Sequence, residues 1–265
     1  MSDVIVYILT NDLESARVDK VKALFTNSLF TVNVVNIAPP VNLTTEEAQE
    51  QFQVSWILKN AKQQYPDNYV LIIKDSSISN LDSDSLANAI QDAISLPGWD
   101  VYYLCKWMDN CSLYNETIPI PGGSSMFYKA NSPHGAQAIL YSPHGRDVVI
   151  GDAPMKNGQT FKANGSFSSA LNKAVAQGNI NAIVSNPNLI DFDISANPRQ
   201  GYKLNQCGGP NGNGSNGNGM ASGISIWLFI IIIVALILLA WALLKVGPQP
   251  PSVRPRITGV PIYRR

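Results

Sequence analysis

One segment of the chain, residues 224–244, carries no charge and is apolar apart from Ser225 (ISIWLFIIIIVALILLAWALL). As a helix it would span about 31 Å, close to the roughly 30 Å hydrocarbon core of a bilayer. Trp227 and Trp241 lie near its two ends, where indole rings favour the membrane interface, and Lys245 ends the apolar run. The sequence therefore predicts one C-terminal transmembrane helix in a lipid bilayer, with Trp227, Trp241 and Lys245 at the interfaces.

The segments on either side of this helix have biased compositions. Residues 201–223 are rich in Gly and Asn and cannot bury much apolar surface, which predicts a flexible linker. Residues 245–265 combine prolines with arginines and contain no acidic residue, which predicts an extended basic tail. Anionic lipid or nucleic acid is the expected partner of such a tail.

The remaining part, residues 1–200, holds all 19 acidic residues and has the length of one domain with its own core. A second large domain does not fit. The chain has 3 cysteines and no paired CxxC spacing, which excludes a disulfide scaffold and the common zinc sites. We expect these cysteines to be reduced.

Short β-branched runs alternate with helical patterns along residues 1–200. This alternation predicts an α/β fold with a mostly parallel sheet and helices on both faces. The predicted strands are 4–9, 30–37, 69–73, 101–105, 126–130 and 182–184, and the predicted helices are 15–26, 44–64, 86–96, 135–140 and 167–176.

Lys74, Asp75 and Ser76 directly follow the continuous apolar run YVLII. Ligands of open α/β sheets bind at the carboxyl ends of the strands, so chemistry is expected at these three residues. By contrast, Ser-Pro-His-Gly occurs at 132–135 and 142–145 and contains both histidines of the chain. Two imidazoles are too few for a metal site, and we interpret both segments as turns at helix boundaries.

Several strings over residues 3–193 resemble glycosyltransferase family 25, the lipopolysaccharide-biosynthesis and collagen-galactosyltransferase type. They are IVYILTNDLESAR, VSWILKNA, VLIIKDS, WDVYYL and GSSMFYKANSPHGAQAIL, in the order and spacing of that family. The resemblance implies a GT-A-like fold, a nucleotide sugar as substrate and a divalent metal held by an acidic cluster.

This chain departs from the family pattern at the positions that the resemblance implies for metal binding and catalysis. The acidic cluster of the family is similar in position to Lys74, Asp75 and Ser76 of this chain. Of these three residues, only Asp75 has a carboxylate. Where the family has a helix with a Ser-His pair, this chain has Ser55-Trp56. The family also has an acidic residue at the place of the stretch 166–169 (SFSS), which contains none. Arg17 is retained. The resemblance thus leaves Arg17, Lys74 and Asp75 as vestigial nucleotide-sugar-binding residues, with no catalytic residue, no metal ligand set and no cofactor.

These observations lead to a leading hypothesis, a non-catalytic glycosyltransferase-like module anchored by a single C-terminal membrane pass. Its role would be structural or scaffolding, as a minor capsid protein that links a protein shell to an internal membrane in a virion. Capsid components are then the expected protein partners.

Two alternatives stay open. The first is an active membrane-bound glycosyltransferase that uses a nucleotide sugar, either with Mn²⁺ or with Lys74 neutralising the diphosphate. The second is a surface glycoprotein of inverted topology, for which five N-x-[ST] sequons would be acceptors: Asn42, Asn110, Asn115, Asn164 and Asn213.

Overall fold

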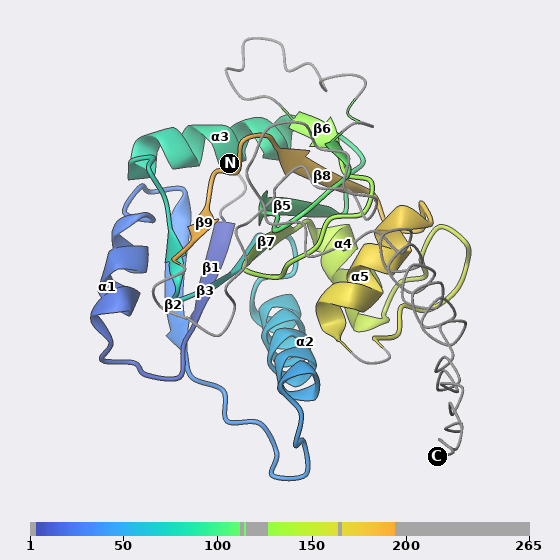
Figure 1. Cartoon of the computed structure of the whole chain (residues 1–265), viewed down its shortest axis with the longest axis horizontal. Coiled ribbons are helices and arrows are strands. Elements are labelled where there is room, and N and C mark those ends of the chain that lie inside the picture. Colours follow the sequence, from blue (N-terminus) through green and yellow to red (C-terminus); the bar gives the residue numbers. More distant parts are fainter. Residues whose placement is uncertain (1–3, 112–113, 115–126, 164–165, 194–265) are drawn as a thin grey trace, which may run out of the picture. The chain divides into compact units, whose positions relative to one another are not determined.

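Seven strands form one sheet with the order β2-β1-β3-β7-β5-β8-β6 (Figure 1). We describe this sheet from a computed structural model, over residues 4–111, 114, 127–163 and 166–193. The strands are β1 (Val4–Leu9), β2 (Phe30–Val35), β3 (Tyr69–Lys74), β5 (Val101–Cys105), β6 (Phe127–Lys129), β7 (Ala138–Tyr141) and β8 (Ala182–Ser185). A separate two-stranded sheet pairs β4 (Ser77–Ile78) with β9 (Asp191–Phe192).

The large sheet is mostly parallel, as expected. β7 runs antiparallel to both β3 and β5, and β6 runs antiparallel to β8. The other adjacent pairs of this sheet are parallel. The central strands are buried along their whole length because helices cover both faces, which explains their continuous apolar sequences.

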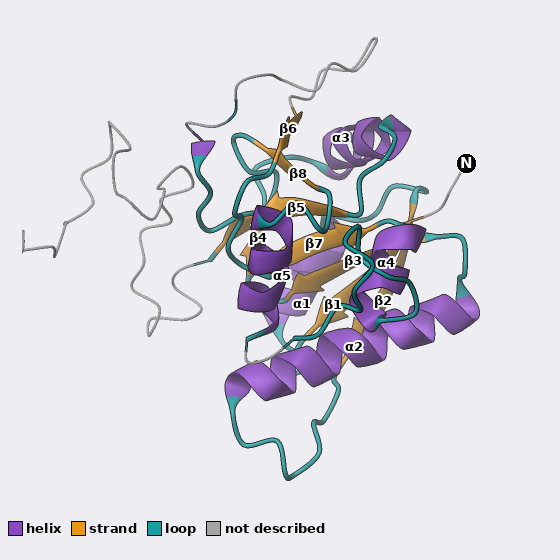
Figure 2. Cartoon of the chain, turned by 90° about the vertical axis from the view of Figure 1, so that its right-hand side faces the viewer, coloured by secondary structure: helices purple, strands orange, loops and turns teal. Residues whose placement is uncertain are grey.

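Helices cover both faces of this sheet (Figure 2). One core contains side chains of α2 (Glu46–Gln64), α4 (Pro143–Ile150) and α5 (Phe167–Ala176). The other contains side chains of α3 (Ser83–Ser95) and of the segment around α1 (Ala16–Ala23). Cap residues set the helix starts: Thr45 accepts from Ala48 N at the start of α2, and Asp82 accepts from Ser85 N at the start of α3.

Three sequence-based expectations are wrong. Residues 132–135 are not at a helix boundary, because they lie between strands β6 and β7. Residues 135–140 are not a helix: the segment contains the start of β7, whose four residues are all buried between β3 and β5. The helix begins later, at α4, where the Ser142 side chain accepts from Gly145 N and Pro143 occupies the first turn. Cys105 is a free, buried thiol as expected, whereas Cys111 is disulfide-bonded.

The predicted linker, transmembrane helix and basic tail, with Trp227, Trp241 and Lys245, lie outside the described residues. Among the helices that the structure does describe, none combines the length and the apolar character needed to cross a membrane.

Candidate functional site

The carboxyl ends of β1 and β3 lie side by side, so the residues that follow them share one edge of the sheet. Leu9 and Lys74, the last residues of the two strands, are register partners. The backbone N–H of Asp75 donates to the carbonyl of Leu9 at 3.1 Å. This pairing brings Thr10 and Asp75, the next residue of each segment, to the same edge.

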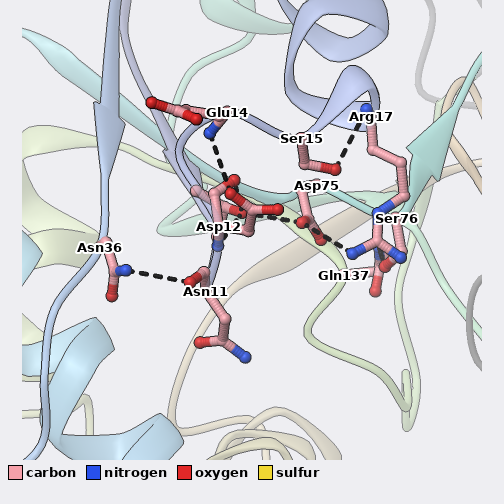
Figure 3. Close-up of polar contacts among 10 residues, drawn as sticks. Asn11, Asp12, Glu14, Ser15, Arg17, Asn36, Asp75, Ser76 and Gln137 are labelled. Carbon is pink, nitrogen blue, oxygen red and sulfur yellow. Dashed lines mark hydrogen bonds and ion pairs between the residues drawn. The ribbon is translucent and has the colours of Figure 1, made fainter.

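Asp75 is held by two partners from the β1–α1 segment (Figure 3). Its Oδ2 accepts a hydrogen bond from the Thr10 hydroxyl at 2.8 Å and lies 3.4 Å from an Nη of Arg17. The side chain of Asp75 is 15% exposed and that of Arg17 is 45% exposed. Two of the three residues singled out from the sequence, Arg17 and Asp75, therefore meet in the structure.

Lys74, the third residue, has a different partner. Its Nζ lies 2.5 Å from Oε1 of Glu50, which belongs to α2. The pair lines a cavity of about 350 Å³, together with Trp107, His134 and Ser168 among others. Lys74 and Asp75 are adjacent in sequence, yet each carries a charge that another element of the fold already neutralises.

The loops around Asp75 are fixed by short-range hydrogen bonds. Asp12 N donates to the Thr10 hydroxyl oxygen at 3.0 Å, and Glu14 N donates to Asp12 Oδ1 at 3.0 Å. In the segment that follows Asp75, the hydroxyls of Ser76 and Ser77 accept from the Gln137 amide, each at 2.9 Å. Ser76 is thus engaged by Gln137.

The residues at this edge do not fit a divalent metal. Such a cation takes several hard oxygen ligands. Asp75 is the one carboxylate of the Lys74-Asp75-Ser76 segment, and a guanidinium and a hydroxyl already contact its Oδ2. Within the described residues, no group of three or more His, Cys, Asp or Glu side chains is arranged to hold a metal ion.

Sequence reasoning missed Thr10 and Glu50. Thr10 had a usable signal, because it directly follows β1 and the carboxyl ends of neighbouring parallel strands meet at one edge. Glu50 had none, since its contact with Lys74 depends on how α2 packs against the sheet. The stretch 166–169 caps and begins α5: Ser166 accepts from Ser169 N at 3.4 Å.

Comparison with known proteins shows similarity to solved structures. No protein-family model and no curated protein matches the chain. The chain is similar to a glycosyltransferase involved in the glycosylation of the major capsid of PBCV-1, with a TM-score of 0.43 and 12% identity, over 72% of this chain and 93% of that one. It is also similar to A197 from STIV, with a TM-score of 0.37 and 10% identity, over 69% and 81%.

A further similar structure is the apo form of the glycosyltransferase GlyE from Streptococcus pneumoniae TIGR4. The TM-score is 0.30 at 11% identity, and the match covers 69% of this chain but 45% of GlyE. This chain therefore spans less than half the length of GlyE. Glycosyltransferases are thus found among the structural neighbours of this α/β domain.

Proposed function

We propose that this chain is a non-catalytic, glycosyltransferase-like module with a structural or scaffolding role. The observation that carries the proposal is the engagement of Asp75 by Thr10 and Arg17. A metal-dependent transferase uses carboxylates at this place to hold a cation against the diphosphate of the donor. Here the Asp75 carboxylate instead contacts a guanidinium, whose positive charge would repel a metal ion.

Sugar-nucleotide binding by the full-length chain tests this proposal. Thermal unfolding would be followed with UDP-, GDP- and CMP-sugars, each with and without Mn²⁺, because a ligand that prefers the folded state raises its stability by mass action. We expect no stabilisation that depends on Mn²⁺ and no turnover. Stabilisation that requires Mn²⁺, is lost in Asp75→Asn and accompanies turnover would overturn the proposal.

The second candidate function is a metal-independent glycosyltransferase in which Lys74 contacts the diphosphate. The position of Lys74 in the cavity beside His134 and Trp107 favours it. The 2.5 Å ion pair with Glu50 disfavours it, since that pair would have to open before the ammonium group could bind phosphate. Sugar-nucleotide binding that persists in EDTA and is lost in Lys74→Met, but not in Lys20→Met on the exposed surface of α1, would establish this candidate.

We place the proposed module at a membrane, where residues 224–244 anchor it and residues 201–223 act as its tether. Residues 245–265 then lie across the bilayer near anionic lipid or nucleic acid. A minor capsid protein that joins a protein shell to an internal virion membrane would have this arrangement. Gentle extraction of the full-length chain from its native membrane, followed by identification of co-purified capsid proteins, tests the setting, and extraction without any capsid component counts against it.

A further inference from the structure

A second cavity lies at the opposite edge of the sheet, where parallel strands begin. Its volume is about 470 Å³, and its lining includes Tyr69 at the start of β3, Asp100 just before β5 and Asn181 just before β8. The Lys74–Asp75 site lies at the carboxyl ends of the strands. The two sites are therefore separated by the length of the strands.

A histidine–aspartate pair forms part of this second cavity. His144 Nδ1 lies 2.8 Å from Oδ1 of Asp100, whose side chain is 9% exposed. The other carboxylate oxygen, Oδ2, accepts from the backbone N–H of Asn181 at 2.7 Å. Because a carboxylate only accepts, the imidazole donates from Nδ1, and its orientation is fixed. The His144 side chain is 69% exposed, which leaves its far edge, with Nε2, open to a ligand.

Lys156 adds a positive charge to the same lining. Its ammonium group donates to the side-chain oxygen of Asn181, an amide and not a carboxylate. The Asn181 amide nitrogen in turn donates to the Gly98 carbonyl at 2.7 Å. Lys156 is thus held at the cavity by a neutral partner, and its charge is not cancelled there.

The lining holds one ammonium group, that of Lys156, and one carboxylate, that of Asp100, so its net charge is positive when His144 is protonated. Asp100 is the one carboxylate in its lining, and both of its oxygens are engaged. The remaining wall is largely apolar, with Trp99, Pro143, Val148, Pro154 and Met155. An apolar wall beside a few convergent polar donors is the usual composition of a small-molecule pocket.

We propose that this cavity binds a small organic anion, whose carboxylate or phosphate group is held by His144 Nε2 and Lys156 Nζ. The apolar wall contacts the uncharged part of the ligand. The site is independent of the proposed scaffolding role, because it uses no residue of the Lys74–Asp75 edge.

Nuclear magnetic resonance of the two histidines tests this directly. The chain contains only His134 and His144. His134 lines the cavity that contains Lys74, so its resonance reports anion binding there separately from binding at His144. Full-length protein labelled at its histidines would be titrated with inorganic phosphate and, separately, with acetate at constant ionic strength. The titrations would be made at about pH 6, because a protonated imidazole donates from Nε2 as well as from Nδ1.

We expect a saturable shift of the His144 resonance with an unchanged His134 resonance. Saturation by phosphate alone or by acetate alone identifies the group that the site prefers. Lys156→Gln should weaken the affinity roughly tenfold, the effect of losing one charged hydrogen bond, while Lys20→Gln on α1 should leave it unchanged. Lys156 lies on the surface, so this variant does not disturb the core.

Three results would overturn the proposal. They are an unshifted His144 resonance at millimolar concentrations of both anions, parallel non-saturating shifts of both histidines, and unaltered affinity in Lys156→Gln. Each would show that His144 and Lys156 do not form an anion site.

Discussion

The guanidinium of Arg17 lies 3.4 Å from the carboxylate of Asp75, although 58 residues separate them along the chain. Arg17 lies in the first turn of α1 and Asp75 directly follows β3, so this contact joins α1 to the carboxyl end of β3. Asp75 also accepts the Thr10 hydroxyl, and the three side chains form one polar cluster. Thr10 is buried and the Arg17 side chain is partly exposed, so we expect the two donors to contribute differently to the free energy of unfolding.

The first prediction is that Thr10→Val costs more stability than Arg17→Ala. Thr10 is 2% exposed, and its loss removes a short hydrogen bond from a largely buried carboxylate, which costs about 1–3 kcal/mol. The Arg17 side chain is 45% exposed, and such ion pairs contribute about 0–1 kcal/mol. Equilibrium urea unfolding of the full-length variants measures both values. An equal or larger loss in Arg17→Ala would contradict this ranking.

A second prediction concerns Lys106, a fully buried lysine that directly follows β5. Its Nζ donates to the Ser185 carbonyl at 2.7 Å, and burial lowers the pKa of its ammonium group to about 8. The unfolded chain has the ordinary lysine pKa of 10.5, so between pH 8 and 10.5 the unfolded state binds more protons. The Lys106 contribution to the free energy of unfolding therefore rises with pH across this window, by roughly 3 kcal/mol in total.

The matched variant Lys106→Met isolates this contribution. Burial raises the pKa of Tyr102 above its ordinary value of 10, and this has the opposite effect near pH 10. Both proteins keep Tyr102, so its effect cancels in the difference between wild type and Lys106→Met. This difference reports Lys106 together with its charge coupling to the neighbouring buried Cys105 thiol, whose pKa burial raises to about 12. Urea unfolding at several pH values, with Lys20→Met as a surface control, would show a widening difference, and a constant difference would exclude a depressed lysine pKa.

The sheet was predictable where its strands have long apolar runs. YVLII and VYYLC are bounded by polar residues and correspond to buried strands β3 and β5. The prediction of a helix at residues 135–140 is wrong because a short apolar run fits a buried helix or a buried strand equally well. Neighbouring strands on both sides select the strand for 138–141, and a sequence pattern does not reveal neighbours.

The candidate site was predictable in its place but only partly in its contacts. Asp75 follows a buried strand, and the rule for strand ends located it. The pairing of Lys74 with Glu50 depends on the position of α2 over the sheet, which local sequence does not encode. The pairing of Asp100 with His144 likewise depends on β7 lying next to β5, and the helix predicted at 135–140 hid that neighbour.

A third prediction is that Gly145→Ala destabilises the protein, although alanine usually favours a helix. Gly145 lies in α4, and a Cβ added to it would be 1.9 Å from the Asp100 carbonyl oxygen. Overpacking of this kind costs about 1–3 kcal/mol and exceeds the gain of about 1 kcal/mol from helix propensity. Asn88→Ala on the exposed face of α3 is the control and should be neutral or slightly stabilising. A more stable Gly145→Ala, measured by thermal unfolding, would contradict this close approach.

The last prediction concerns Arg146, which joins α4 to the end of α2. Its side chain is 2% exposed, and its guanidinium donates to the carbonyls of Tyr65 at 3.0 Å and Pro66 at 2.6 Å. A third contact, at 3.2 Å, reaches Asp147 Oδ1. Arg146→Ala leaves two carbonyls without this donor and opens a cavity, with an expected loss of about 3–5 kcal/mol.

Arg146→Lys distinguishes the geometry of the guanidinium from its charge. A lysine keeps the positive charge but cannot reproduce the planar fork that reaches both carbonyls, so we expect it to remain clearly less stable than wild type. Arg17→Lys, at the half-exposed pair with Asp75, serves as the matched control and should change stability by less than about 0.5 kcal/mol. Urea unfolding gives the free energies, and hydrogen exchange of the Tyr65 amide, which donates to the Ala61 carbonyl at 2.7 Å, reports whether the end of α2 loosens. Wild-type stability in Arg146→Lys would mean that the charge alone holds α4 against α2.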